Sequence, residues 1–538
     1  MRVDRHSVPE QTPSAAIEFV RTRYAEQARA AEAGGLPGVR WLGEVLLEYV
    51  GARTVELDPE VEERETWLAL RSAVVLFRDF VQGQAAPKHS DCFANAGYAS
   101  HYFRFTKGDE ALTVREWDAA WWPALGLRFD AVLEQLAELC PDDHAEGQAL
   151  VALWSGQDMD TRTLDGHVGP ALRAIERRDA DLFDDALIRV LRRHRDAASA
   201  RVRDMREGGY RQLAKDLISW EAVGLAALAH MAGMPIGVES GYLPVRLVTG
   251  AGPVVPRADG GPIARPECAA EVAAEWLDRN PRVAQRRIDA IQRFDGSLPG
   301  WFNVVYCIAS DLRAEQGYRS VLDPRFEDPR SWEVLTRATE AAAQAFKLVT
   351  APPGSMIAVT VEGRTTELPA GEVDDSYASG SAYTHAVALA WTTRSAAALD
   401  ILARVRRFRR ESEEPPTGFA QAIRALVQGG DARDALRAAL EAPGSGDYAQ
   451  YVEQPRTRLL ERLVAGDHAG FDSALAEALT RYSTFYSSGS RSDQFDGQLN
   501  FEVLGLACRA ADQGFPITVE SDYLPRRVIE GAWLTSTR

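Results

Sequence analysis

The feature that most constrains the fold of this chain is a long segment that occurs twice. Residues 220–247 (WEAVGLAALAHMAGMPIGVESGYLPVRL) and residues 501–528 (FEVLGLACRAADQGFPITVESDYLPRRV) are related by an offset of 281 and are identical at 15 of 28 positions. Solenoid repeats have periods of roughly 20–50 residues, so a period of 281 corresponds to a whole domain. The sequence therefore predicts a tandem duplication of one domain.

The identical positions predict one local structure in both copies. Small residues at the start of the segment favour a central helix that neighbouring helices approach closely. A glycine then ends the helix in a left-handed conformation, and a proline two residues later prevents its continuation. A short extended stretch and a Tyr-Leu-Pro anchor follow. The repeated positions are Glu221, Gly224, Gly233, Pro235, Glu239, Tyr242 and Pro244 in the first copy, and Glu502, Gly505, Gly514, Pro516, Glu520, Tyr523 and Pro525 in the second.

The repeated glutamates and tyrosine permit two interpretations. A pair of carboxylates can perform acid–base catalysis, and a tyrosine can act as an acid. In the structural interpretation, the carboxylates cap a helix, accept hydrogen bonds from the adjacent backbone or pair with Arg246 and Arg527. The tyrosines are then core residues whose hydroxyl groups have a partner. We favour the structural interpretation, because the rest of the motif consists of packing residues.

Length and composition fit two globular domains. A length of 538 residues allows two to five domains at about 100–200 residues each, and the duplication selects two. The apolar fraction of 46% and the charged fraction of 26% are those of an ordinary globular protein. We expect a first domain at residues 1–248, a linker rich in Gly and Pro at 249–267, and a second domain at 268–538.

Hydrophobic periodicity predicts a mostly α-helical fold in both domains. Apolar residues recur at helical spacing over 180–204 and over its counterpart 467–485, and a further helix is predicted at 386–408. Alternating residues around a central turn predict one small β-hairpin in each domain, at 102–114 and at 356–368.

The charge of the chain limits its partners. A net charge of −17 argues against a nucleic-acid-binding surface and would suit a basic partner, although an acidic surface also serves solubility alone.

The five cysteines lack a CxxC spacing, and the N-terminus lacks the apolar core of a signal peptide, so we expect a cytoplasmic location. The longest apolar stretch, 222–238, is too short and too broken by Gly and Pro to span a membrane.

Local motifs of catalysis and cofactor binding do not occur in the sequence. It has no Walker loop, no GxGxxG after a predicted strand, no HExxH and no GxSxG. His89, Cys92 and His101 lie close together, but their spacing matches no zinc-binding pattern. We therefore expect no catalytic, cofactor-binding or metal-binding residues, and no cofactor.

The repeated segment supports a family assignment by resemblance. Its pattern, GLAxxAxxxGxPIxVESxYLPxR, resembles the C-terminal signature of bacterial immunity protein family 49, whose members are encoded beside polymorphic toxins. The second copy follows FYSSGSRSD (485–493), which is also similar to that family's ending. The resemblance implies a mostly α-helical, cytoplasmic, non-enzymatic protein that blocks a cognate toxin by binding over its active site. It assigns no catalytic residues and leaves the toxin-binding residues open.

Three hypotheses follow for the function. The first is an immunity protein whose acidic charge suits a basic toxin of the nuclease or deaminase type. The second is a helical enzyme that uses the repeated Glu and Tyr residues, which predicts a polar, concave pocket around Glu239 or Glu520. The third is a helical scaffold that organises a complex without inhibiting anything.

Overall fold

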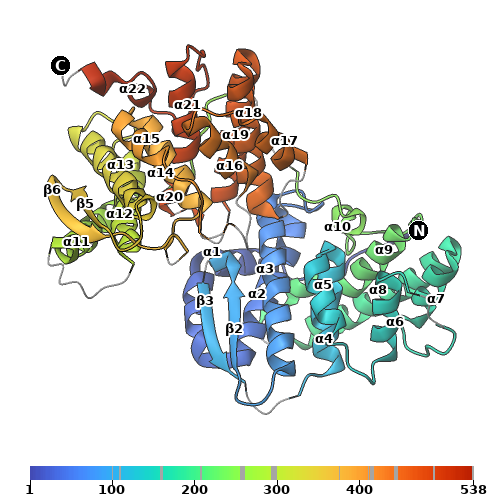
Figure 1. Ribbon diagram of the computed structural model, residues 1–538. Helices are drawn as coiled ribbons and strands as arrows, with labels where there is room; N and C mark the ends of the chain where they lie inside the picture. The colour runs from blue at the N-terminus through green and yellow to red at the C-terminus, as the bar shows by residue number, and fades with distance from the viewer. Residues whose placement is uncertain are drawn as a thin grey trace. The chain divides into compact units, whose positions relative to one another are not determined.

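The structure is a computed structural model, and it consists mainly of α-helices (Figure 1). The chain divides into two compact units, Met1–Val255 and Pro256–Arg538. The described residues are 1–99, 101–107, 111–157, 161–205, 209–254, 261–292, 300–374, 376–409, 411, 417–441, 446–488, 491–492 and 494–535. A mostly α-helical fold was predicted from the sequence, and it is confirmed.

The first unit packs its helices around α2, which contacts α1, α3 and η3. Trp117 and Trp121 of α4 are fully buried and stack with ring centroids 4.7 Å apart. The elements are β1 (Arg2–Val3), α1 (Gln11–Ala30), η1 (Ala31–Gly34), α2 (Gly35–Glu56), α3 (Arg64–Ala85), β2 (Asp91–Ala96), η2 (Gly97–Ala99), β3 (His101–Thr106), α4 (Val114–Leu127), α5 (Asp130–Ala137), α6 (Ala145–Trp154), α7 (Gly169–Arg177), α8 (Ala180–Asp204), η3 (Tyr210–Leu217), α9 (Trp220–Met231), β4 (Glu239–Ser240) and α10 (Val245–Thr249).

The second unit, coloured yellow-green to red in Figure 1, packs α12 against α11 and α13 in the same way. Its elements are α11 (Ala270–Gln292), α12 (Trp301–Leu322), α13 (Pro329–Thr350), β5 (Met356–Val361), β6 (Arg364–Pro369), α14 (Gly380–Thr392), α15 (Ala396–Leu402), α16 (Gly418–Val427), α17 (Arg433–Glu441), η4 (Ala449–Glu453), α18 (Gln454–Ala465), α19 (His468–Tyr486), α20 (Phe495–Gln498), α21 (Phe501–Asp512), α22 (Arg526–Ile529) and η6 (Ala532–Thr535).

The turn after the central helix is built alike in the two units. Asp58 follows α2 and Asp323 follows α12, and each carboxylate accepts two backbone N–H groups and one hydroxyl group at the start of the next helix. Val61 and Phe326 adopt φ values of 58° and 54°, which non-glycine residues rarely adopt. The shared turn agrees with the predicted duplication, which we retain as an interpretation.

The two hairpin predictions have different outcomes. The hairpin at 356–368 is confirmed, because β5 pairs antiparallel with β6 around Glu362 and Gly363, both at positive φ. The hairpin at 102–114 is wrong, because β3 pairs with the preceding strand β2. The expected turn was Lys-Gly-Asp at 107–109, of which residues 108–109 lie outside the described residues. Thr113 with Glu116 forms a capping box that starts α4. The capping signal therefore overrides the alternation that suggested a second strand.

The helix predicted at 386–408 is also wrong in its extent. The chain forms α14 and α15, which are separated by Arg394 in the left-handed conformation at φ 52°. Ser395 then caps α15, because its side chain accepts the N–H of Ala398 at 3.3 Å. Arg128 occupies the matching left-handed position between α4 and α5. The break is therefore a feature of both units that apolar periodicity alone does not show.

Candidate functional site

The repeated motif forms the buried helices α9 and α21, which pack against α4 and α14 respectively. Gly224 and Gly505 lie where these helices approach their neighbours closely. A Cβ atom on Gly224 would lie 2.7 Å from the indole of Trp122, and one on Gly505 would lie 2.7 Å from the carbonyl oxygen of Ala388. These glycines allow the helix packing that positions the rest of the motif.

After each helix, the motif adopts the local structure that its residues favour. Gly233 and Gly514 are left-handed, at φ 77° and 83°, and Pro235 and Pro516 follow them. Tyr242 and Tyr523 are fully buried. The hydroxyl of Tyr242 accepts the backbone N–H of His6 at 2.8 Å, and that of Tyr523 donates to the carbonyl of Gly497 at 3.1 Å.

The extended part of the motif pairs with the first segment of its own unit. β1 runs parallel to β4, with Val3 opposite Ser240, and Ile263 forms a parallel bridge to Ser521. The hydroxyl of Ser240 donates to the carbonyl of Val3 at 2.6 Å, and that of Ser521 donates to Ile263 at 2.8 Å. Both repeated serines therefore anchor an N-terminal segment.

Arginines two residues further along fix these N-terminal segments to the central helix. Arg5 donates to the hydroxyl of Thr54 at 3.0 Å, and Arg265 donates to the hydroxyl of Ser320 at 2.9 Å. Sequence reasoning placed Ile263 and Arg265 in a linker and missed these contacts. The available signal was the pair of tripeptides Val-Asp-Arg at 3–5 and Ile-Ala-Arg at 263–265.

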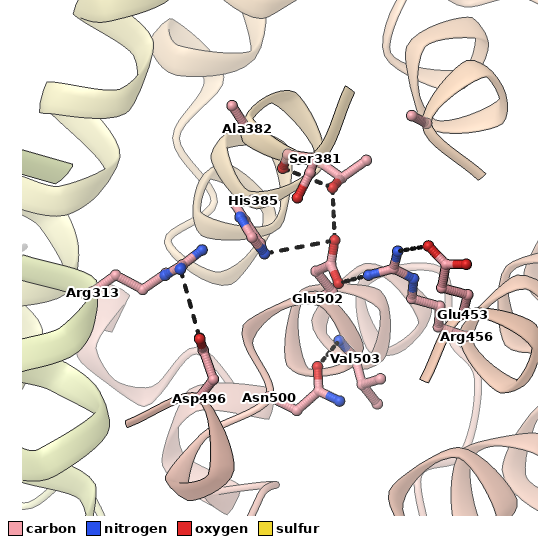
Figure 2. Close-up of polar contacts among 12 residues, drawn as sticks. Arg313, Ser381, Ala382, His385, Glu453, Arg456, Asp496, Asn500, Glu502 and Val503 are labelled. Carbon is pink, nitrogen blue, oxygen red and sulfur yellow. Dashed lines mark hydrogen bonds and ion pairs between the residues drawn. The ribbon is translucent and has the colours of Figure 1, made fainter. Parts of the chain in front are cut away.

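Glu502 lies at the centre of a buried charged cluster in the second unit (Figure 2). Its side chain is 9% exposed and forms an ion pair with Arg456 of α18. The same carboxylate accepts a hydrogen bond from the hydroxyl of Thr384 at 2.6 Å. Nε2 of His385 lies 4.0 Å from Oε1 of Glu502. Three helices, α14, α18 and α21, thus contribute to one polar cluster.

The two arginines of the cluster have further partners. Arg456 lies 3.6 Å from Glu453 and stacks over the ring of Phe419, with 4.6 Å between its Cζ and the ring centroid. Arg313 extends from α12 and lies 3.6 Å from Asp496, as Figure 2 shows. Cations and carboxylates therefore alternate through the cluster, which is how buried charges are retained in a protein interior.

The protonation states of the cluster follow from burial and from these pairs. Burial alone would raise the pKa of Glu502, but the charge of Arg456, the hydrogen bond from Thr384 and the charge of Arg313 more than offset this, so its pKa lies below the ordinary value. Burial lowers the pKa of His385 to about 3. At neutral pH, Glu502 is charged and His385 is neutral. A general acid or base works best with a pKa near the operating pH, so these values suit charge pairing rather than proton transfer.

Glu221 occupies the aligned position in the first unit, but its environment differs. Its side chain is 29% exposed and lies 2.5 Å from His167 Nε2. The hydrogen bond to Glu221 raises the pKa of His167. The repeated glutamate thus has a buried arginine partner in one unit and a partly exposed histidine partner in the other. A single chemistry repeated in both units is not built around it.

The other expected partners of the repeated carboxylates bond elsewhere. Arg246 donates to the carbonyl of Gly252 at 2.8 Å and lies 3.7 Å from Glu62. Arg527 is exposed, as are the side chains of Glu239 and Glu520. Sequence reasoning missed Arg313, His385 and Arg456, because they come from three distant segments and share no local spacing. The only signal for them was that a buried glutamate requires a cation.

A concave pocket of about 710 Å³ borders Glu239 in the first unit. The enzyme hypothesis predicts that such a pocket is polar. Its wall instead consists mainly of the apolar residues Met234, Ile236, Val238, Leu243, Val245 and Val248. A wall of this composition is better suited to an apolar side chain than to acid–base chemistry.

Among the described residues, no group of three or more His, Cys, Asp or Glu side chains is placed to hold a metal ion. Within the same part of the chain, no helix has both the length and the apolar character needed to cross a bilayer.

Comparison with known families decides the assignment. The family model for immunity protein 49 matches residues 169–247 and 323–528, which together make up more than half of the chain. The chain belongs to the immunity protein 49 family. The match covers the repeated motif in both units, together with α7–α9 of the first unit and most of the second. No curated protein and no solved structure matches the chain.

Proposed function

We propose that this immunity protein 49 family member neutralises a cognate bacterial toxin by binding it directly and covering its active site. The observation that carries the proposal is the family match over residues 169–247 and 323–528. The character of the repeated motif supports it, because the motif builds a scaffold and Glu221 and Glu502 have different partners. In this proposal the protein acts in the cytoplasm, without a cofactor and without catalysis of its own.

The charge of the chain suggests the class of toxin. A protein with a net charge of −17 attracts a basic partner and accelerates their association. Toxins that act on nucleic acids have basic active-site surfaces, because their substrates are polyanions. We therefore propose a toxin of the nuclease or deaminase type, with the immunity protein imitating the charge of its substrate.

A growth assay with a matched binding assay tests this function. The toxin domain encoded beside this gene is expressed in a sensitive host, with and without the full-length immunity protein. The two proteins are then co-purified, with a catalytically inactive toxin variant as the control for expression. We expect restored growth together with a stoichiometric complex, and loss of toxin activity in the purified complex.

The other outcomes separate the remaining hypotheses. Restored growth without a complex would favour an enzyme that reverses the damage. A complex without restored growth would favour a scaffold. If the toxin is neither bound nor neutralised, the proposed function is wrong.

A further inference from the structure

The pocket beside Glu239, which we call the motif groove, lies on the repeated motif of the first unit. The segment Gly233–Ser240 forms one wall, and residues of the Tyr-Leu-Pro anchor and α10 form the other. Met234, Val238, Leu243 and Val248 are buried and form an apolar floor. Val245, at the edge, leaves 53% of its surface exposed. The motif groove has a volume of about 710 Å³, which is large enough to receive side chains from another protein.

Two carboxylates border this apolar floor. Glu60 and Glu239 line the groove, and both residues are exposed. His230 also lies at the edge, where its ring is 3.1 Å from the guanidinium of Arg128. The same guanidinium donates to the carbonyl of Val248 at 2.8 Å and so fixes one end of the groove. The groove therefore combines an apolar floor with two exposed border carboxylates, while the ammonium group of Met1 donates to the carbonyl of Gly237 in one wall at 2.7 Å.

The aligned surface of the second unit has a different charge pattern, in which two arginines replace groove residues while Glu520 keeps the carboxylate of Glu239 and Glu530 replaces Thr249. Arg526 stands in place of Val245 and donates to the carbonyl of Ile517 at 2.8 Å, so that its side chain extends over the equivalent wall. Arg325 stands in place of Glu60 and is exposed. The open apolar edge at Val245 and the pair of carboxylates Glu60 and Glu239 are thus particular to the first unit, although the underlying motif is shared. Two copies of one scaffold can carry different surface residues. A binding surface on one copy is therefore not expected to recur on the other.

We propose that the motif groove binds the toxin through an apolar side chain that inserts among Met234, Val245 and Val248, flanked by a Lys or Arg side chain that pairs with Glu60 and Glu239. This inference rests on the proposed function and identifies the unit and the surface that perform it. Charge complementarity supports it, since two exposed carboxylates beside an apolar floor, on a protein with a net charge of −17, favour a basic partner. The buried floor supplies an apolar centre, and Val245 at the edge loses its exposure to water when a partner side chain covers it, as interface hot spots require.

A substitution taken from the chain's own second unit tests the groove. Val245→Arg places at this edge the residue that the second unit carries there. The matched control is Val272→Arg on α11, a valine that is 38% exposed and does not line the groove. With the full-length protein and the toxin domain encoded beside the gene, we expect Val245→Arg to raise the Kd at least tenfold. The control should change the Kd less than twofold, and equal Kd values for the two variants would overturn the proposal.

The charge requirement has its own matched test. The double variant Glu60→Gln with Glu239→Gln removes two charges from the groove, and Glu18→Gln with Glu26→Gln removes two exposed charges from α1. Both variants have the same net charge. We expect the groove variant to associate several-fold more slowly and with a weaker salt dependence, because the lost charges face the partner. If the two double variants associate at the same rate, the acidic border has no specific role and the proposal is wrong.

A third measurement uses the unchanged protein, so it does not depend on a variant that folds. Hydrogen exchange of the wild-type complex should show protection of residues 234–248, and less protection of the aligned residues 515–529. A complex without protection at 234–248 would overturn the groove and leave the proposed function standing. Failure of the wild-type protein to bind the toxin would instead overturn the proposed function, and the groove inference with it.

Discussion

Replacing Glu502 by glutamine removes one charge from the buried cluster and nearly preserves the shape of the side chain. The new amide keeps an oxygen for the hydrogen bond from Thr384 but loses the ion pair with Arg456. Arg456 is then left buried, with Glu453 at 3.6 Å as its remaining carboxylate. Removing one member of a buried ion pair costs about 3–5 kcal/mol, because the other charge loses its compensation. The retained hydrogen bond and the contact with Glu453 favour the lower end of that range.

The aligned glutamate of the first unit provides an internal control. Glu221 is 29% exposed, compared with 9% for Glu502, and it pairs with a histidine. The pair of Glu221 with His167 is partly exposed, and exposed pairs contribute about 0.2–1 kcal/mol, so Glu221→Gln should have a smaller effect than Glu502→Gln. The two substitutions are chemically identical and occupy the same position of the motif. Their difference therefore isolates the effect of the buried cluster.

Differential scanning calorimetry at pH 7 measures both variants. A loss of about 3–5 kcal/mol corresponds to a decrease in Tm of roughly 6–20 °C for a unit of this size, and a loss of about 1 kcal/mol to roughly 2–4 °C. We expect the transition of the second unit to shift in Glu502→Gln and only a small shift in Glu221→Gln. Equal shifts in the two variants would refute the reasoning that the cluster around Glu502 is a compensated, buried charge network.

Three further predictions concern packing, the N-terminal strand and pH. Gly51→Ala would place a Cβ atom 2.0 Å from the carbonyl oxygen of Ala214 in η3, so urea denaturation should show a decrease of about 1–3 kcal/mol or more in the free energy of unfolding. The control Gly371→Ala has open space around the new Cβ atom and should change that free energy by less than about 0.5 kcal/mol. Tyr242→Phe leaves the buried N–H of His6 without its acceptor, so we expect the free energy of unfolding to fall by about 1–3 kcal/mol. Hydrogen exchange in the first residues of the chain should become faster, and unchanged exchange would contradict this. Burial lowers the pKa of His385 from about 6.5 in the unfolded chain to about 3, so the folded state binds fewer protons in this range and stability declines as the pH falls through it. The Tm of His385→Gln should therefore differ less between pH 7 and pH 5 than the Tm of the wild-type protein does.

Local sequence signals predicted the parts of the fold that local interactions determine. The period of apolar residues placed α8 and α19, and the glycine and proline of the motif placed the end of each motif helix. The hairpin at 102–114 was wrong because alternation over few residues does not identify the partner strand, which here precedes β3. The extent of the helix at 386–408 was wrong because the left-handed conformation of Arg394 gives no signal in apolar spacing.

The candidate site was predictable only in part, for the same physical reason. Glu502 was selected because it recurs, but Arg313, His385 and Arg456 come from α12, α14 and α18. Tertiary packing brings these residues together, and one sequence carries no record of it. The motif groove was equally hidden, because its distinguishing feature is a difference between two copies at single positions such as Val245. A feature of that kind becomes meaningful only when a fold shows which residues face the same space.

The pairing of each unit's first residues with its own repeated motif has a consequence for how such chains can be rearranged. Val3 lies beside Ser240, and Ile263 lies beside Ser521, so the two ends of each unit meet in space. Because its ends lie close together, a unit of this type can be joined to another copy, or circularly permuted, with only a short bridging peptide. The same pairing determines where a single unit can begin without losing contacts. A fragment of the second unit that begins at residue 268 would lack Arg265 and its bond to Ser320, whereas one that begins before Ile263 would retain the closure.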